Sequence, residues 1–346
     1  MKKIFSLRRH GYLKTVGVFL IAVALIAGVV GCEGEGEDLY TLTMEVDPPG
    51  SGEAIDVTGA AAYEAGTAID IQATANSGFQ FVNWTASDGT FVNANAIRTV
   101  FTMPAKNVIV TAKFVIQLDL FKCYHTPHEP PHETVFLEDQ FVAINASLNW
   151  TQWFCNPAAK VQDDVVTPIK HPDHHLTIYN IYYEGITDPP GYWEVEVDNQ
   201  FGTNQKMSVE GYPWFLAVPT QKLEPGDHNP PLFLDHFLVY RAMNGEDLQI
   251  DIGLNDEFGN DSAVSVRLPM LYGIPCRKTH DGTITAIKFP ETYLVFYLLS
   301  GSEVTDYGTI QIDNQFGLQE LPGGGESLLV AVPSEQLSAE YIEFED

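Results

Sequence analysis

The sequence predicts an all-β protein, in which a small β module is followed by a multi-repeat antiparallel β sandwich or barrel-like assembly. Two observations predict this class. Apolar and polar residues alternate along short segments bounded by Gly, Pro, Asn and Asp, which is the pattern of antiparallel strands with one face exposed to water. A short phrase also recurs about every 58 residues, as "DNQFG" at 198–202 and 313–317, which indicates a repeated supersecondary unit.

The N-terminal segment, residues 1–31, has the features of a lipoprotein signal peptide. A basic start precedes an uncharged apolar run at 16–30, which is shorter than the roughly 20 residues that span a bilayer as a helix. The run ends in "VVGC", which resembles the lipobox of bacterial lipoproteins and implies a lipid on Cys32. The alternative is an ordinary signal peptide whose Cys32 later joins a disulfide. Glu33 stands where inner-membrane retention signals carry Asp, which favours the outer membrane.

Residues 32–39 contain "EGEGED" and are expected to be an acidic tether. An exported protein folds in an oxidising compartment, where cysteines form disulfides. Three cysteines follow the tether, so one disulfide and one free thiol are expected.

A small β module is predicted at residues 40–115. Alternation begins at Tyr40 in "YTLTMEV" and returns at 68–75 and 108–114. "YEAGTAIDIQATANSGFQFVNWT" and "FTMPAKNVIVTAKF" resemble the divergent internalin-B-type repeat domain of bacterial surface proteins. This resemblance implies a β-grasp-like module that serves as a spacer. Trp84 is expected to pack in its core rather than to stack on a ligand.

Residues 117–340 are predicted to form four units that must pack together, because about three strands cannot bury their own apolar face. The expected units are 117–165, 174–226, 234–281 and 291–340. In each unit the phrase follows a strand, and its Asp or Asn is expected to bond nearby backbone while a Gly takes positive φ in a turn. The aromatic residue of each phrase is expected to pack in the core: Phe141, Phe201, Phe258 and Phe316.

This repeat region resembles tandem copies of an uncharacterised bacterial domain with the pattern "FKCY…LEDQF…CNP…K". That family occurs in secreted and envelope proteins and has no assigned activity. The first copy alone holds both family cysteines, and copies two and four have lost both. Their joint loss predicts a disulfide between Cys123 and Cys155, which leaves Cys276 as a free, buried thiol.

Composition and motifs argue against several functions. The chain has 46 acidic and 18 basic residues and a net charge of −28, which argues against binding nucleic acid. The sequence contains no GxSxG, HExxH, phosphate-binding glycine loop or dinucleotide fingerprint, so we expect neither catalysis nor a cofactor.

Two sets of residues are candidate ligand sites. Histidines in two Pro-containing loops would form a metal site if the loops met: His125, His128, His132, His171 and His174. The alternative is that exposed loops simply tolerate histidine. His175 is attributed to structure, because His236 occupies the same position in its unit. Trp150 and Trp153 lie on opposite faces of a strand, so at most one is core and the other is available to stack on a sugar.

The sequence therefore favours a non-catalytic lipoprotein of the bacterial cell envelope, on either side of the outer membrane. The module would be a spacer, and the repeats would be a head for surface interaction, adhesion or a structural role. The expected partners are the membrane, through the lipid on Cys32, and an extracellular or envelope protein or polysaccharide. The alternative is a carbohydrate- or metal-binding envelope module.

Overall fold

A computed structural model describes residues 38–183, 191–224 and 228–343. Strands dominate these residues and no helix occurs in them, which confirms the all-β class. No helix in these ranges is therefore long and apolar enough to cross a membrane. The signal peptide, Cys32 and the tether up to residue 37 lie outside the described residues.

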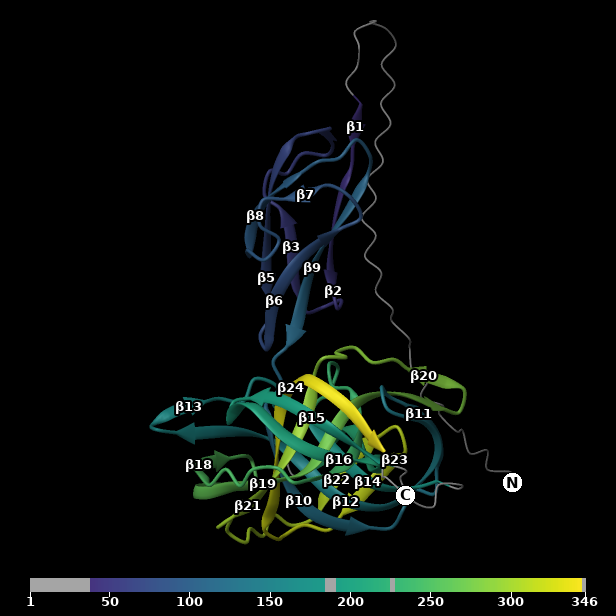
Figure 1. The fold of residues 1–346 in the computed structure, drawn as a ribbon, viewed down its shortest axis with the longest axis vertical. Coiled ribbons are helices and arrows are strands. Elements are labelled where there is room, and N and C mark those ends of the chain that lie inside the picture. Colours follow the sequence, from purple (N-terminus) through teal and green to yellow (C-terminus); the bar gives the residue numbers. More distant parts are fainter. Residues whose placement is uncertain (1–37, 184–190, 225–227, 344–346) are drawn as a thin grey trace, which may run out of the picture. The chain divides into compact units, whose positions relative to one another are not determined.

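The small module comprises nine strands in residues 39–116 (Figure 1). Its strands are β1 (Leu39–Tyr40), β2 (Leu42–Asp47), β3 (Gly52–Asp56), β4 (Tyr63–Glu64), β5 (Ala68–Ala75), β6 (Phe79–Ala86), β7 (Thr90–Phe91), β8 (Arg98–Thr102) and β9 (Val108–Ile116). One sheet has the order β2-β9-β6, with β2 parallel to β9, and a second has the order β3-β5-β8-β7. The short strands β1 and β4 form a separate antiparallel pair.

The two larger sheets of the module share one core. Ile69 and Ile71 from β5 are buried in the same cluster as Val108 and Val110 from β9. Trp84 is 2% exposed, and its indole nitrogen donates to the carbonyl of Ala96 at 3.0 Å. The prediction that Trp84 is a core residue is confirmed.

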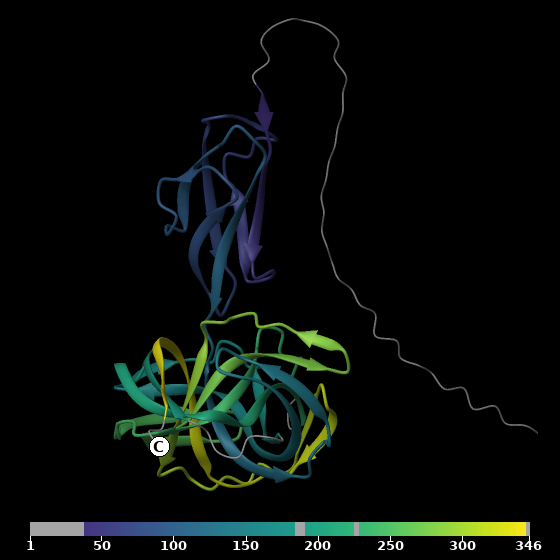
Figure 2. The ribbon, with the colours of Figure 1, turned by 45° about the vertical axis from the view of Figure 1, so that its right-hand side comes forward.

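The repeat region contains the remaining strands, β10 to β24 (Figure 2). Units one and two contain β10 (Leu120–His128), β11 (Thr134–Glu138), β12 (Ala143–Gln162), β13 (Val165–Thr167), β14 (His175–Tyr182), β15 (Gly191–Asn199) and β16 (Gly202–Glu224). Units three and four contain β17 (His236–Met243), β18 (Ile250–Asn255), β19 (Asn260–His280), β20 (Thr283–Thr285), β21 (Tyr293–Ser300), β22 (Ile310–Asn314), β23 (Gly317–Leu321) and β24 (Ser327–Glu343).

Eight of these strands close into a ring. Each unit contributes its opening strand and its long closing strand, and successive neighbours are all antiparallel, in the order β10-β12-β14-β16-β17-β19-β21-β24. The last strand, β24, then pairs with the first, β10, through Phe121↔Ala331 and Lys122↔Val330. The repeats therefore form a closed eight-stranded barrel.

The middle strand of each unit pairs with the closing strand of the unit two positions away. β11 of unit one pairs with β19 of unit three, and β18 of unit three pairs with β12 of unit one. In the same way β15 pairs with β24, and β22 pairs with β16. Units one and three are thus joined by two strand pairings, and so are units two and four.

Side chains cover both faces of the barrel strands. Neighbouring residues fall in two different apolar clusters, as Ile178 and Tyr179 do on β14 and Val239 and Leu238 do on β17. One face of every strand in a closed barrel points to its centre. The centre is therefore packed with side chains.

The recurrent phrase is a turn that locks onto a tyrosine of another unit. In each copy the Asp or Asn side chain accepts a hydrogen bond from the backbone N–H of the phrase's Phe, at 2.8 to 3.1 Å. The same side chain meets a tyrosine hydroxyl two units away: Tyr240 on Asp139, Tyr297 on Asn199, Tyr124 on Asp256 and Tyr179 on Asn314. The prediction of a structural turn is thus confirmed.

The glycine of the phrase has a smaller role than predicted. Gly317 has a φ of +93°, but Gly202 and Gly259 do not take positive φ, and the first copy carries Val142 in this place. The hydrogen bonds of the Asp or Asn side chain hold the turn without a left-handed residue.

The disulfide between Cys123 and Cys155 is present and Cys276 is a free, buried thiol, as predicted. The two bonded cysteines face each other on the paired strands β10 and β12. In unit two the corresponding pair is Ile178 and Ala217, which is apolar. The covalent link thus replaces an apolar contact between barrel strands.

We predict that Tyr240→Phe lowers the free energy of unfolding of the repeat region by roughly 1–3 kcal/mol, because it removes the buried donor to Asp139, which lies 2.7 Å away. Denaturant titration measures this change. Tyr182→Phe is the matched control, since its side chain is 61% exposed, and it should change stability by less than about 0.5 kcal/mol. Equal effects of the two substitutions would contradict a stabilising role of the hydrogen bond between Tyr240 and Asp139.

We also predict that replacing Cys123 and Cys155 with alanine lowers stability by roughly 3–4 kcal/mol, because the bond closes a loop with a sequence separation of 32. Cys276→Ala is the control and should cost on the order of 1 kcal/mol or less, because unit one carries Ala158 at the corresponding position. Denaturant titration without reductant compares the variants. A loss for the pair no larger than for the control would refute the stabilising role of the bond.

Candidate metal centre

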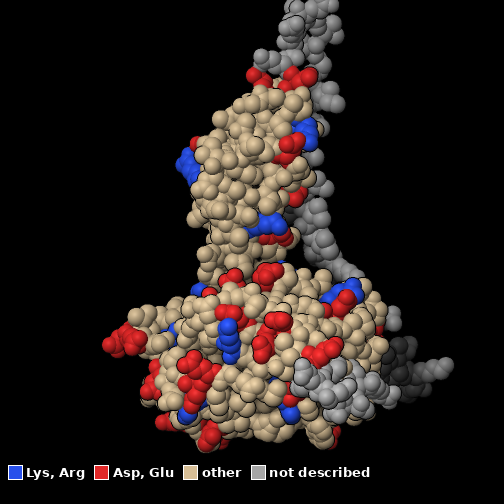
Figure 3. Space-filling view, in the orientation of Figure 1, with Lys and Arg blue, Asp and Glu red and all other residues tan. Residues whose placement is uncertain are grey.

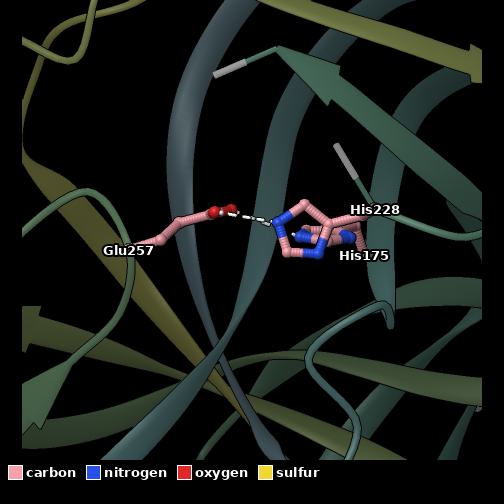
Figure 4. A group of neighbouring side chains, drawn as sticks. All are labelled: His175, His228 and Glu257. Carbon is pink, nitrogen blue, oxygen red and sulfur yellow. Dashed lines mark hydrogen bonds and ion pairs between the residues drawn. The ribbon is translucent and has the colours of Figure 1, made fainter. Parts of the chain in front are cut away.

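Three metal-ligating side chains meet at the junction of units two and three. His175 is the first residue of β14, Glu257 lies in the turn between β18 and β19, and His228 follows β16. One ligand atom from each lies within 4.8 Å of the others (Figure 4). Among the residues described, this is the one such group of His, Cys, Asp or Glu.

The carboxylate of Glu257 stands at the centre of the group. Its Oε1 lies 3.3 Å from Nε2 of His175, and its Oε2 lies 3.1 Å from Nε2 of His228. Lys222 approaches the same Oε2 with its amine at 2.5 Å. One carboxylate thus faces two imidazoles and an ammonium group.

His228 lies between two carboxylates. Its Nδ1 is 3.2 Å from Oδ1 of Asp173, while its Nε2 faces Glu257. Asp173 is held in place by Asn229, whose backbone N–H and side-chain amide both donate to it. The side chain of His228 is 19% exposed, so solvent reaches this edge of the group.

The electrostatic environment keeps His175 neutral and Glu257 charged. Burial lowers the pKa of His175, and this effect outweighs the nearby carboxylate. Burial raises the pKa of Glu257, but hydrogen bonds from His175 and Lys222 outweigh it and bring the pKa to about 2. A neutral imidazole and an ionised carboxylate are the forms that bind metal ions.

The corresponding place at the next junction shows what a purely structural version looks like. There Nε2 of His236 lies 3.1 Å from Oε1 of Gln315, and Lys278 donates to the same amide oxygen. At this junction the neutral amide of Gln315 stands at the position of the phrase that Glu257 holds in unit three. The group at His175 differs by having a carboxylate and a second histidine.

A second cluster of charged side chains is buried, and its carboxylates, Asp256 and Asp261, lie near Glu257 in the sequence. Lys122 is 1% exposed, and its amine is 2.9 Å from Asp261 and 3.9 Å from Asp256. The ammonium group occupies the place between these carboxylates that a cation would need. This group is therefore a structural ion pair.

Two family models match separate parts of the chain. Residues 42–117 match the divergent InlB B-repeat domain. The small module is therefore similar to that domain. Residues 180–332 match a repeat of unknown function, DUF7450, which agrees with the tandem repeats predicted from the sequence. No curated protein and no solved structure matches the chain.

The small module lies outside the candidate metal centre, and so do the five histidines named from the sequence. His125 is exposed on β10, His128 lies 3.1 Å from the carbonyl of Glu129, and His132 has a φ of 57°. His171 and His174 stack on each other, with ring centroids 4.4 Å apart. None of these five residues belongs to the group that the structure brings together.

The two tryptophans predicted to face opposite ways differ in exposure. Trp153 packs against the buried cluster of the barrel and lies edge-on to Phe215, at 5.0 Å between ring centroids. Trp150 is 53% exposed on the same strand, β12. Trp150 is thus the ring that is available to a ligand.

Sequence reasoning missed His228, Glu257 and Lys222 as members of one group. A signal was present, because Glu257 is the acidic member of a position that otherwise holds Gln140, Gln200 and Gln315. The signal could be recognised only after the repeats were aligned. The sequence does not reveal that the loop carrying His228 returns to this turn.

Proposed function

We propose that the protein is a non-catalytic lipoprotein of the bacterial cell envelope, anchored by a lipid on Cys32. The small module acts as a spacer, and the barrel of repeats acts as a head that binds an envelope or extracellular protein or polysaccharide. The match to the divergent InlB B-repeat domain and the lipobox-like sequence support this function.

One observation supports the proposal that the barrel binds its partner on its outer surface. Apolar clusters bury both faces of the described barrel strands, so side chains fill the centre. This packing favours a partner that binds the outer surface. Among the exposed side chains of that surface, the ring of Trp150 suits stacking on a sugar.

The surface charge supports a partner other than nucleic acid. Asp and Glu side chains are spread over the face drawn in Figure 3, and the whole chain carries a net charge of −28. An acidic surface repels phosphate backbones and attracts basic or cation-bearing partners.

We predict that Cys32→Ser releases the protein from the membrane fraction, because the lipid is the anchor. Cys276→Ala is the matched control and should stay in the membrane, since it changes a buried cysteine away from the lipobox. Cell fractionation followed by immunoblotting measures both variants. Retention of the Cys32→Ser variant would contradict the lipid anchor.

Protease treatment of intact cells then distinguishes the two sides of the outer membrane. Digestion of the repeat region in intact cells means that the head is displayed on the surface. Protection until the outer membrane is permeabilised means that the head faces the periplasm, where envelope proteins and peptidoglycan are the partners to test. Recovery of the wild-type protein from the cytoplasm would overturn the proposed function.

A further inference from the structure

We propose that His175, His228 and Glu257 bind one Zn²⁺ ion per chain, which fastens the segment after β16 to the turn of unit three. The ion would have three protein ligands, and a water molecule would fill the remaining position. The site is independent of where the protein is anchored. Failure of the zinc site would therefore leave the proposed function intact.

The ligand set and its spacing fit zinc. Zn²⁺ binds imidazole nitrogen and carboxylate oxygen at about 2.0–2.2 Å, so neighbouring ligand atoms in a tetrahedral site lie about 3.3–3.5 Å apart. Oε1 of Glu257 lies 3.3 Å from His175 and Oε2 lies 3.1 Å from His228. One ligand atom from each of the three residues lies within 4.8 Å of the others, so binding one ion draws them together by at most about 1.5 Å.

The two carboxylates that flank His228 favour a cation on its ring. A neutral imidazole carries one N–H, yet both of its ring nitrogens face a carboxylate oxygen, at 3.2 and 3.1 Å. If Nδ1 donates to Asp173, then Nε2 presents a lone pair to Glu257, and a cation between them removes the repulsion. A carboxylate on the far nitrogen is the usual partner of a metal-bound histidine.

The alternative source of positive charge is a proton on His228 together with the ammonium group of Lys222, which lies 2.5 Å from Oε2 of Glu257. In that case the group is an ion-pair network like the one around Lys122. The two cases differ in what Lys222 does. If zinc binds, Lys222 competes with it for the carboxylate, and removing the amine strengthens zinc binding.

The chain supplies its own control for the carboxylate. Gln140, Gln200 and Gln315 occupy the position of Glu257 in the other three phrases, and at the third junction His236 and Lys278 contact Gln315 much as His175 and Lys222 contact Glu257. Glu257→Gln therefore places in unit three the residue that the other units already tolerate. It removes the charged ligand while the turn is kept.

The test is a calorimetric titration of the full chain, purified in detergent and stripped of metal with a chelator, with Zn²⁺ at neutral pH. We expect one saturable site in the wild type, and none in Glu257→Gln or in His228→Gln. Asp173→Asn should weaken binding by roughly 10–100-fold, as loss of a partner of a metal-bound histidine does. Lys222→Gln should tighten it. X-ray absorption of the loaded protein should show two imidazole ligands.

Two controls separate this site from the other histidines. Replacing His125, His128 and His132 with alanine, or His171 and His174, should leave the stoichiometry at one zinc per chain. Circular dichroism must show that Glu257→Gln folds as the wild type does. The proposal is overturned if the wild type shows no saturable binding, if Glu257→Gln binds as tightly as the wild type, or if Lys222→Gln weakens binding.

Discussion

The pairing of β24 with β10 is the contact on which the rest of the repeat region depends. A unit of three strands has an apolar face that it cannot bury, and an open row of four units would leave two sheet edges exposed. Closure removes both edges, because the last strand returns to the first in the same antiparallel arrangement that joins the other units. The four units are therefore parts of one barrel rather than four domains.

Hydrogen bonds between the turn of one unit and a tyrosine of the opposite unit make this closure specific. A turn with Asp, such as Asp139, accepts directly from the tyrosine hydroxyl of Tyr240. A turn with Asn donates instead, as Asn199 does to Tyr297, and the hydroxyl then donates to Gln205 at 2.7 Å. The direction of the hydrogen bond is thus reversed, and the side-chain amide of Gln205 accepts the hydroxyl proton in place of a carboxylate. The tyrosine hydroxyl therefore has a partner in both kinds of turn. This requirement explains why the phrase recurs.

Much of this fold could be predicted from the sequence, because the alternation of apolar and polar residues and the repeat of about 58 residues can both be read along the chain. The core position of Trp84 and the turn at each phrase follow from them. The ring closure could not be predicted, since the pairing of β10 with β24 joins residues about 200 positions apart. The candidate metal centre was missed for the same reason, because His228 and Glu257 are far apart in the sequence and no local pattern predicts that they meet. The histidine-rich loops were the signal in the sequence, and the second of them adjoins this group through Asp173 and His175, but the five histidines named as ligands are not part of it.

Native-state hydrogen exchange at the junction of β10 and β24 tests the closed barrel most directly. The amides that pair across this junction, in the register of Phe121 with Ala331, should exchange as slowly as those between β12 and β14, because both junctions then open only when the whole barrel unfolds. Fast exchange confined to β10 and β24, as at the free edges of an open sheet, would contradict closure.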